Sequence, residues 1–219
     1  MTEAQAEEIL LTLRNVFTLP EWITSDKDSF KTLVTTIISQ NTADRNTARA
    51  IENLSKNYPI TPEALANAET NRIEENLKVA GLYRNKSKTI KKVSEIILEE
   101  FHGDLDSILS LPFDEAREIL MQLPGVGPKT ADVVLLFCAG KPTIPVDTHV
   151  NRVSKRLGLA LTDGDYEAVR KSLQALFSPN DYLAIHILLI MLGRRYCKAG
   201  KPLCRDCPVN KICLKKFSK

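Results

Sequence analysis

The chain has 219 residues, of which 43% are hydrophobic and 26% are charged, an ordinary composition for a globular protein of one domain or two small ones. Its longest apolar run, residues 182–193, is interrupted by His186 and falls short of the roughly 20 residues that cross a bilayer. The acidic, amphipathic start lacks the pattern of a signal or transit peptide. We therefore expect a protein that stays inside the cell and has no membrane partner.

The charge is unevenly distributed. The whole chain carries a net +3, but residues 194–219 contain nine Lys or Arg and one acid, so this end carries +8 and the first 193 residues carry −5. A basic end on an acidic body indicates a polyanionic partner or, alternatively, a solvated tail.

Apolar residues recur at helical spacing from the first segment onward, and no segment alternates like a strand. At the start, Thr2 and Gln5 have the spacing of a capping box before an amphipathic helix. Thr61-Pro62 predicts an N-cap followed by proline in the first helical position, and a helix starting at Thr70 is expected to end at Gly81. Further helices are expected before Gly103, before Gly158 and before Pro179, and a central buried helix over 183–192. The sequence predicts an all-α fold.

Residues 123–132, LPGVGPKTAD, lie between two short amphipathic segments and predict a tight turn between two helices. Gly125 and Gly127 would allow another backbone to approach closely. Unpaired N–H groups at the start of the second helix suit a phosphate, so this turn is a candidate DNA-backbone contact. The alternative is a plain turn in a helical bundle.

Lys129 falls in the first turn of the second helix, where the helix dipole opposes a positive charge. That field, together with partial burial, favours the neutral amine and hence a nucleophile. A solvated lysine or one that contacts phosphate is the competing interpretation.

Four of the five cysteines follow a C-x6-C-x2-C-x5-C pattern: Cys197, Cys204, Cys207 and Cys213. A compartment inside the cell disfavours disulfides, so this group is expected to bind metal. The spacing alone leaves zinc and an iron–sulfur cluster open, with two disulfides as a remote alternative. Cys138 lies on an apolar helix face and is expected to be a small buried side chain.

LPGVGPKTAD followed by Pro145-Val146-Asp147-Thr148-His149 resembles the signature of the endonuclease III superfamily of helix–hairpin–helix DNA glycosylases. Ser39-Gln40-Asn41-Thr42, Gly81-Leu82-Tyr83 and the cysteine spacing agree with it, and the similarity covers about residues 28–213. The resemblance implies two helical domains with the active cleft between them. Residues 23–140 would form a six-helix domain that contains the hairpin (about 114–139). Residues 1–22 and 141–219 would form a discontinuous domain in which a 4Fe–4S cluster binds the four cysteines of loop 197–213.

The resemblance also implies a base-excision-repair DNA glycosylase with AP lyase activity that flips a damaged base out of duplex DNA. Lys129 would attack the sugar C1′, form a Schiff base and nick 3′ to the abasic site by β-elimination. Asp147 would stabilise charge on the sugar and assist proton transfer, although its position equally suits a helix N-cap. Oxidised pyrimidines are the expected lesion, and a monomer in the cytoplasm, nucleoid-associated in a prokaryote, is the expected state.

Further DNA contacts are expected by resemblance. Gln40 and Leu82 match residues that fill the space left by the flipped nucleotide; an ordinary polar helix end and a hydrophobic helix C-terminal contact are the alternatives. Asn41 departs from the small residue common there, which bears on the opposite-strand preference. The remaining candidates are in the hairpin and the basic end: Gly125, Val126, Gly127, Thr130, His149, Lys198 and Lys201. A monofunctional mismatch glycosylase (for uracil, thymine or adenine) and a non-catalytic iron–sulfur DNA-binding module are the rival functions.

Overall fold

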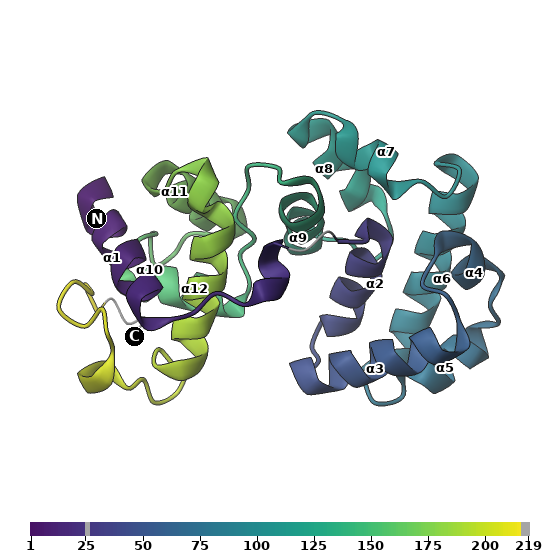
Figure 1. Ribbon diagram of the computed structural model, residues 1–219, viewed down its shortest axis with the longest axis horizontal. Coiled ribbons are helices and arrows are strands. Elements are labelled where there is room, and N and C mark those ends of the chain that lie inside the picture. The colour runs from purple at the N-terminus through teal and green to yellow at the C-terminus, as the bar shows by residue number, and fades with distance from the viewer. Residues whose placement is uncertain (25–26, 216–219) are drawn as a thin grey trace. The chain divides into compact units, whose positions relative to one another are not determined.

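The computed structural model describes residues 1–24 and 27–215, and all the regular structure in these two ranges is helical (Figure 1). This confirms the predicted all-α fold. The chain divides into two compact units, residues 1–25 with 142–219 and residues 26–141. The first is called the terminal unit below and the second the middle unit.

The described part of the middle unit contains eight α-helices where six were expected, because two six-residue segments also close a helical turn. Thr61 caps one of them and Asp104 the other. The eight helices are α2 (Ser29–Ser39), α3 (Asp44–Asn57), α4 (Pro62–Asn67), α5 (Thr70–Leu77), α6 (Tyr83–Glu100), α7 (Leu105–Ser110), α8 (Phe113–Gln122) and α9 (Pro128–Ala139).

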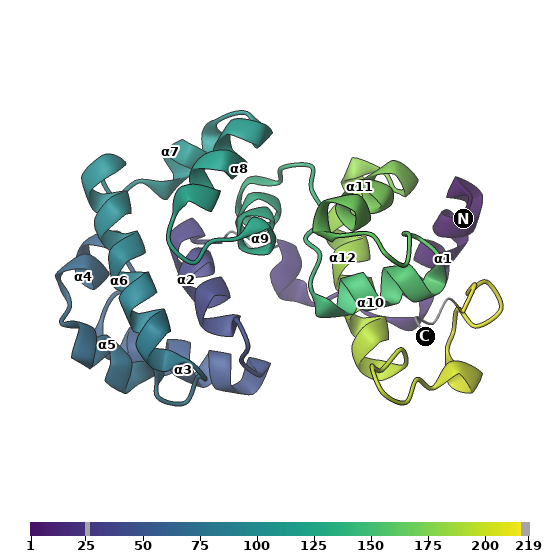
Figure 2. The same cartoon turned by 180° about the vertical axis from the view of Figure 1, so that it is seen from behind.

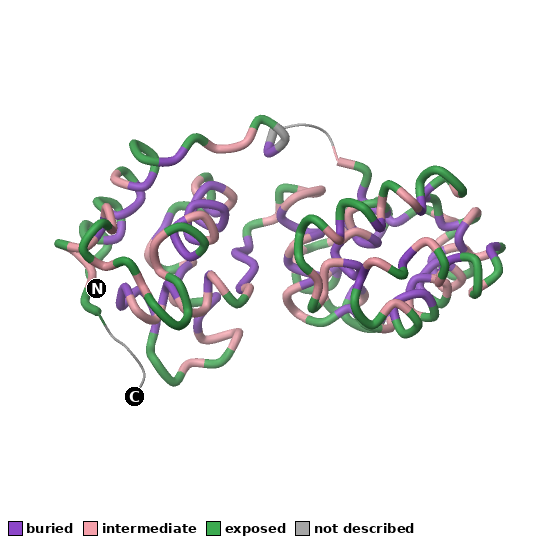
Figure 3. The backbone as a smooth tube through the Cα atoms, turned by 90° about the horizontal axis from the view of Figure 1, so that it is seen from below, coloured by how far each residue is buried: buried purple, intermediate pink, exposed green. Residues whose placement is uncertain are grey.

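One continuous apolar core holds this unit together. Each of the eight helices contributes buried apolar residues to it, as Leu33 and Ile37 of α2 and Ile90, Val93 and Ile97 of α6 illustrate. Figure 3 shows these buried positions recurring along the helices between exposed ones. The core places α2, α6 and the α8–α9 pair in contact, and these elements carry the candidate site residues of this unit.

The predicted helix signals are mostly confirmed. Thr2 and Gln5 form the capping box, and Thr61 caps a helix whose first residue is Pro62. The prediction that Gly81 ends the helix from Thr70 is wrong: α5 ends at Leu77. The N–H of Ala80 donates to the Leu77 carbonyl at 2.8 Å, so the chain has already turned before the glycine.

The terminal unit is arranged around α12, whose buried face includes Ile185, Leu188 and Leu189. Helix α12 contacts α1 and α10, and α11 in turn contacts α1 and α10 (Figure 2). This confirms the predicted central buried helix. The unit consists of α1 (Glu3–Val16), η1 (Glu21–Thr24), α10 (Thr148–Leu157), α11 (Tyr166–Leu176), η2 (Pro179–Asp181), α12 (Tyr182–Arg195) and η3 (Cys204–Asp206). The last basic residues, Lys216 and Lys219, lie outside the described ranges.

Within residues 1–24 and 27–215, no single helix has the length and apolar character needed to cross a membrane. One pair, Tyr166–Leu176 with Pro179–Arg195, reaches that length and composition together but is bent by 113°.

Candidate functional site

The turn between α8 and α9 depends on one of its two glycines. Gly125 has φ +72°, and a Cβ built on it would lie 2.7 Å from Cγ2 of Thr89 on α6. Both the backbone angle and this close approach exclude a larger residue. Gly127 has φ −92° and no atom within 4 Å of an added Cβ. Of these two glycines, only Gly125 lies against another helix within the protein, and the open space at Gly127 leaves room for another backbone to approach, which stays a prediction.

The start of α9 presents backbone rather than side chains. Its N-cap residue, Gly127, is exposed and supplies no side-chain cap. Val126 and Thr130 are buried, with 4% and 3% exposure. Thr130 Oγ1 accepts a hydrogen bond from Gln40 Nε2 at 3.3 Å. Because both side chains are buried, only the main chain of these two residues can face a ligand. The backbone N–H groups at a helix N-terminus suit an anion.

Lys129 is the second residue of α9 and is half-buried. Its position in the first turn is as predicted, beside the positive end of the helix dipole. The expectation that this lysine is a nucleophile rests on this position.

Sequence reasoning missed a buried ion pair that joins the two hairpin helices. Asp132 on α9 is fully buried, and Arg117 on α8 donates to both of its oxygens, at 2.8 Å to Oδ1 and 3.3 Å to Oδ2. Such a bidentate pair fixes the two helices in register. An acid within the apolar face of a helix was the signal that could have revealed it.

Gln40 and Leu82 lie on two turns of the middle unit. Gln40 ends α2, and its Nε2 also donates to the Gly125 carbonyl at 3.0 Å. Leu82 precedes α6 with φ +57° and is 60% exposed. This exposure contradicts the alternative in which Leu82 makes a buried helix-terminal contact. A non-glycine residue in the left-handed region costs free energy, and such strained residues cluster at functional sites.

Asp147 caps α10 in the terminal unit. Its Oδ1 accepts from the N–H of Val150 at 2.7 Å, which confirms the capping interpretation. The segment before it is held at two points. The Pro145 carbonyl lies 2.9 Å from Nδ1 of the buried His186, and the N–H of Val146 donates to the Tyr166 hydroxyl at 3.3 Å. The fold thus fixes the backbone that carries this carboxylate.

The other candidates of the terminal unit differ in exposure. His149 is half-buried, and its Nδ1 lies 3.0 Å from a guanidinium nitrogen of Arg152. Lys198 and Lys201 are exposed. The polypeptide around Lys198 is anchored from α10, because Arg156 donates to the carbonyls of Lys198 and Ala199 at 2.7 and 2.9 Å.

The four clustered cysteines line one pocket together with Arg156, Leu157, Leu192, Tyr196, Asn210 and Lys215. Burial, reinforced by the neighbouring thiols, raises the pKa of Cys207 and of Cys213. Arg156 Nη1 lies 3.6 Å from the Cys197 sulfur. Among the residues that the structure describes, no three His, Cys, Asp or Glu side chains are spaced to hold one metal ion.

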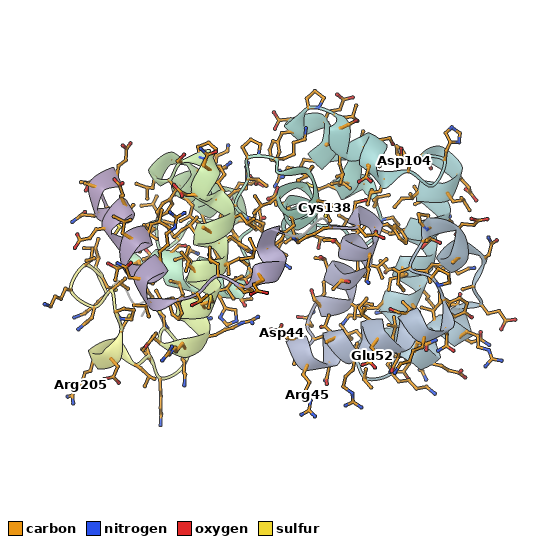
Figure 4. The ribbon with its side chains drawn as sticks, in the orientation of Figure 1. Asp44, Arg45, Glu52, Asp104, Cys138 and Arg205 are labelled. Carbon is orange, nitrogen blue, oxygen red and sulfur yellow. The ribbon has the colours of Figure 1, made fainter. Side chains whose placement is uncertain are left out.

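The fifth cysteine, Cys138, lies on α9 of the middle unit (Figure 4). It is half-buried, not fully buried as expected, and packs against the apolar core of this unit. This partial burial raises the pKa of its thiol.

The sequence matches the family described as "HhH-GPD superfamily base excision DNA repair protein" over residues 34–179. The endonuclease III of Sulfolobus acidocaldarius is 37% identical over 188 residues, which cover 85% of this chain and 82% of that protein. The endonuclease III of Bacillus subtilis is 38% identical over 184 residues, with coverage of 84% and 80%.

Solved structures agree with the sequence relatives. A trapped endonuclease III–DNA covalent intermediate superposes with a TM-score of 0.86 at 31% identity, covering 99% of this chain and 97% of that one. A thermostable thymine-DNA glycosylase, at 20% identity and a TM-score of 0.73, shares the fold. The chain belongs to the endonuclease III family of the HhH-GPD superfamily, the base-excision-repair enzymes that combine DNA glycosylase and lyase activity.

Proposed function

We propose that this enzyme removes oxidised pyrimidines from duplex DNA through a Schiff base on Lys129 and then nicks the strand 3′ to the abasic site. The observation that carries the proposal is the position of Lys129, half-buried in the first turn of α9 directly after the hairpin turn. It is supported by a 31% identical endonuclease III that has been trapped in a covalent intermediate with DNA.

The proposed chemistry uses the Lys129 amine as nucleophile. Its lone pair forms a bond to C1′ while the C1′–N bond breaks, and the base leaves with that electron pair and takes up a proton. The ammonium formed in this step loses a proton, and its nitrogen lone pair then forms the C1′=N bond while the C1′–O4′ bond breaks. O4′ takes up a proton, and the product is the protonated imine. Removal of a C2′ proton expels the 3′ phosphate by β-elimination, which accounts for the nick.

We assign Asp147 to charge stabilisation and proton transfer at this sugar. This role is compatible with its role as an N-cap, because the cap uses only Oδ1. The restraint of the 145–147 segment by His186 and Tyr166 supports it, since a carboxylate that acts on a reacting sugar must be held in place.

We assign a 4Fe–4S cluster to Cys197, Cys204, Cys207 and Cys213. The donor set fits such a cluster, since four thiols face one pocket and Arg156 offers a cation beside them. The bound cluster would supply a structural crosslink. In this proposal residues 197–213 present Lys198 and Lys201 to the DNA backbone from the terminal unit, and His149 makes a further phosphate contact.

In the middle unit we assign the hairpin amides to the phosphates, and Gln40 and Leu82 to the space left by the flipped nucleotide. Backbone N–H groups position DNA without reading its sequence, which suits an enzyme that acts wherever a lesion occurs. We further propose that the enzyme acts as a monomer and that it works on DNA in the cytoplasm.

Borohydride trapping tests the central assignment. Wild-type enzyme incubated with an abasic-site duplex and borohydride should become covalently linked to the DNA, because reduction fixes the imine. Lys129→Ala should abolish both trapping and nicking, while Lys56→Ala, which removes an exposed lysine on α3, should leave both unchanged. Trapping that persists in Lys129→Ala would place the nucleophile elsewhere. Base release by the wild type without any trapping would indicate a monofunctional glycosylase.

A further inference from the structure

Lys86, a buried lysine in the first part of α6, has no part in the chemistry proposed above. Its side chain is 4% exposed. Its Nζ donates to the carbonyl of Ile38 at 2.8 Å and to Oγ1 of Thr42 at 2.5 Å. Both acceptors are more than 40 positions away along the chain, so these bonds tie α6 to the end of α2.

The two bonds lie on either side of Gln40. Ile38 is in the last turn of α2, where carbonyls lack helical partners. Thr42 is the last residue of the turn 39–42, and its hydroxyl accepts from Lys86 while donating to the Gln40 carbonyl at 3.2 Å. The backbone that carries Gln40 is therefore held before and after this residue, and its side chain extends to the hairpin at Gly125.

Lys86 is equally close to the turn that carries Leu82. Its backbone N–H donates to the Leu82 carbonyl at 3.1 Å, in the first turn of α6. A Cβ built on the adjacent Gly81 would lie 3.5 Å from the carbonyl oxygen of Asn41. The 39–42 turn and the 78–82 turn thus lie against each other, and Lys86 is bonded to both.

We propose that Lys86 is the positioning residue for base extrusion: by bonding the 39–42 turn to the start of α6, it holds Gln40 and Leu82 as one rigid wedge. This inference rests on the proposed function, which assigns those two side chains to the space of the flipped nucleotide. A wedge must keep its shape while a base pair is forced apart, and two turns joined only at their surfaces would separate instead.

The chemistry of the site favours this role over a purely stabilising one. Burial lowers the pKa of Lys86, which reflects the cost of removing an ammonium from water. An apolar side chain of similar length would fill the same volume without that cost. What a lysine adds is donors that reach two acceptors on the 39–42 turn at once.

Lys91 supplies a matched control on the same helix. Its Nζ donates to the carbonyls of Ala66 and Ala68, at 2.7 and 2.8 Å, and so satisfies the end of α4. Lys91→Met removes a lysine that bonds two backbone acceptors within the same unit, but neither acceptor belongs to the 39–42 or 78–82 turn. Comparison of Lys86→Met with Lys91→Met therefore separates the loss of the wedge from the loss of a half-buried lysine that bonds backbone carbonyls elsewhere in the unit.

The test compares two DNA substrates. One is a duplex that carries an abasic site with 2-aminopurine opposite it, and the other is the same abasic oligonucleotide as a single strand. In the duplex, the fluorescence of 2-aminopurine reports separation of the strands at the site, and single-turnover nicking reports the chemistry. Lys86→Met should diminish the fluorescence rise and slow duplex nicking by roughly tenfold or more, as expected for misplacement of a positioning group. On the single strand, which requires no separation, its rate should stay within about twofold of wild type.

Lys91→Met should match wild type on both substrates, and Thr42→Val, which removes one acceptor, should act like Lys86→Met to a smaller degree. Thr42→Val also keeps the test decisive if Lys86→Met fails to fold, with helicity and melting checked for each variant. Equal slowing on duplex and single strand, or equal behaviour of Lys86→Met and Lys91→Met, would overturn the inference. A wild-type enzyme that nicks neither substrate would instead refute the proposed lyase function. The role of Lys86 would then be decided by the 2-aminopurine fluorescence of the variants alone.

Discussion

The middle unit and the C-terminal segment 197–215 are stabilised in different ways. In the middle unit every helix buries an apolar face in one core. Within segment 197–215, Val209 is the one residue of the buried class, and Figure 3 draws most of this part in the colours of exposed and intermediate residues. Burial of apolar surface is the main force that folds the first region, and it is nearly absent from the second.

Polar anchors hold the C-terminal segment instead. Arg152 donates to the Cys197 carbonyl at 3.0 Å, and Arg156 donates to the next two carbonyls. Side chains such as Arg205 extend away from the unit (Figure 4). Each hydrogen bond contributes little net free energy to folding, so a segment held mainly by such bonds needs a crosslink to remain ordered. The comparison teaches that the C-terminal segment of the terminal unit is held by polar anchors, whereas the middle unit is held by its apolar core.

The largest expected effect is the loss of one clustered cysteine. Cys204→Ser should abolish the visible iron–sulfur absorbance and make residues 197–215 sensitive to protease, because three thiolates cannot complete the cluster. The helices of the middle unit should persist in the same sample. Cys138→Ser, on α9, is the control and should keep both absorbance and protease resistance. Protection of 197–215 in Cys204→Ser would show that the arginine anchors suffice.

Breaking the buried pair of the hairpin should rank second. Arg117→Ala leaves Asp132 buried without this partner, which is expected to cost about 3 kcal/mol of unfolding free energy. Urea unfolding followed by circular dichroism measures the loss. Arg72→Ala, which breaks an exposed pair with Glu75, should cost under about 0.5 kcal/mol. Equal losses in the two variants would mean that the core tolerates the loss of this partner of Asp132.

A smaller effect is expected from the exposed cations of the terminal unit. Each phosphate contact contributes about −0.9 to the slope of log affinity against log salt, so Lys198→Ala with Lys201→Ala should flatten that slope by about 1.8. Cluster absorbance should be unchanged, as should chemistry on saturated complexes. Lys56→Ala should leave the slope unaltered. A wild-type slope in the double variant would mean that the hairpin alone neutralises phosphates.

The smallest effect concerns a surface pair of the middle unit, Glu52 with Lys56 on α3 (Figure 4). The hydrogen bond and charge of Lys56 lower the pKa of Glu52 below its ordinary value of 4.5. A carboxyl group whose pKa is lowered in the folded state stabilises the protein at pH values above its ordinary pKa. This stabilisation is lost as the pH falls through the lowered pKa. Glu52→Gln should therefore differ slightly from wild type at neutral pH and not at all in strong acid, as melting temperatures across that range would reveal. A difference that grew on acidification would contradict the assignment.

Features that depend on neighbours along the chain were determined by the sequence. The capping box of Thr2 and Gln5, the N-cap at Thr61 and the helix stop at Gly158 follow from local backbone hydrogen bonds and φ preferences. The helical spacing of apolar residues determined the all-α class for the same reason. Local reasoning also predicted the turn of residues 123–132 and offered Lys129 as a candidate nucleophile, whereas the resemblance supplied the catalytic role of Asp147.

Features that join distant residues were decided by the tertiary structure. Gln40 reaches Gly125 and Lys86 reaches Ile38 only because the core brings α2, α6 and the hairpin together. The two glycines of the hairpin look alike in sequence, yet only Gly125 meets Thr89 of another helix. A buried lysine and an exposed one have the same letter and the same local propensity. Their burial differs because different helices pack against them. That packing involves residues far apart in the chain, so a short stretch of sequence does not determine it.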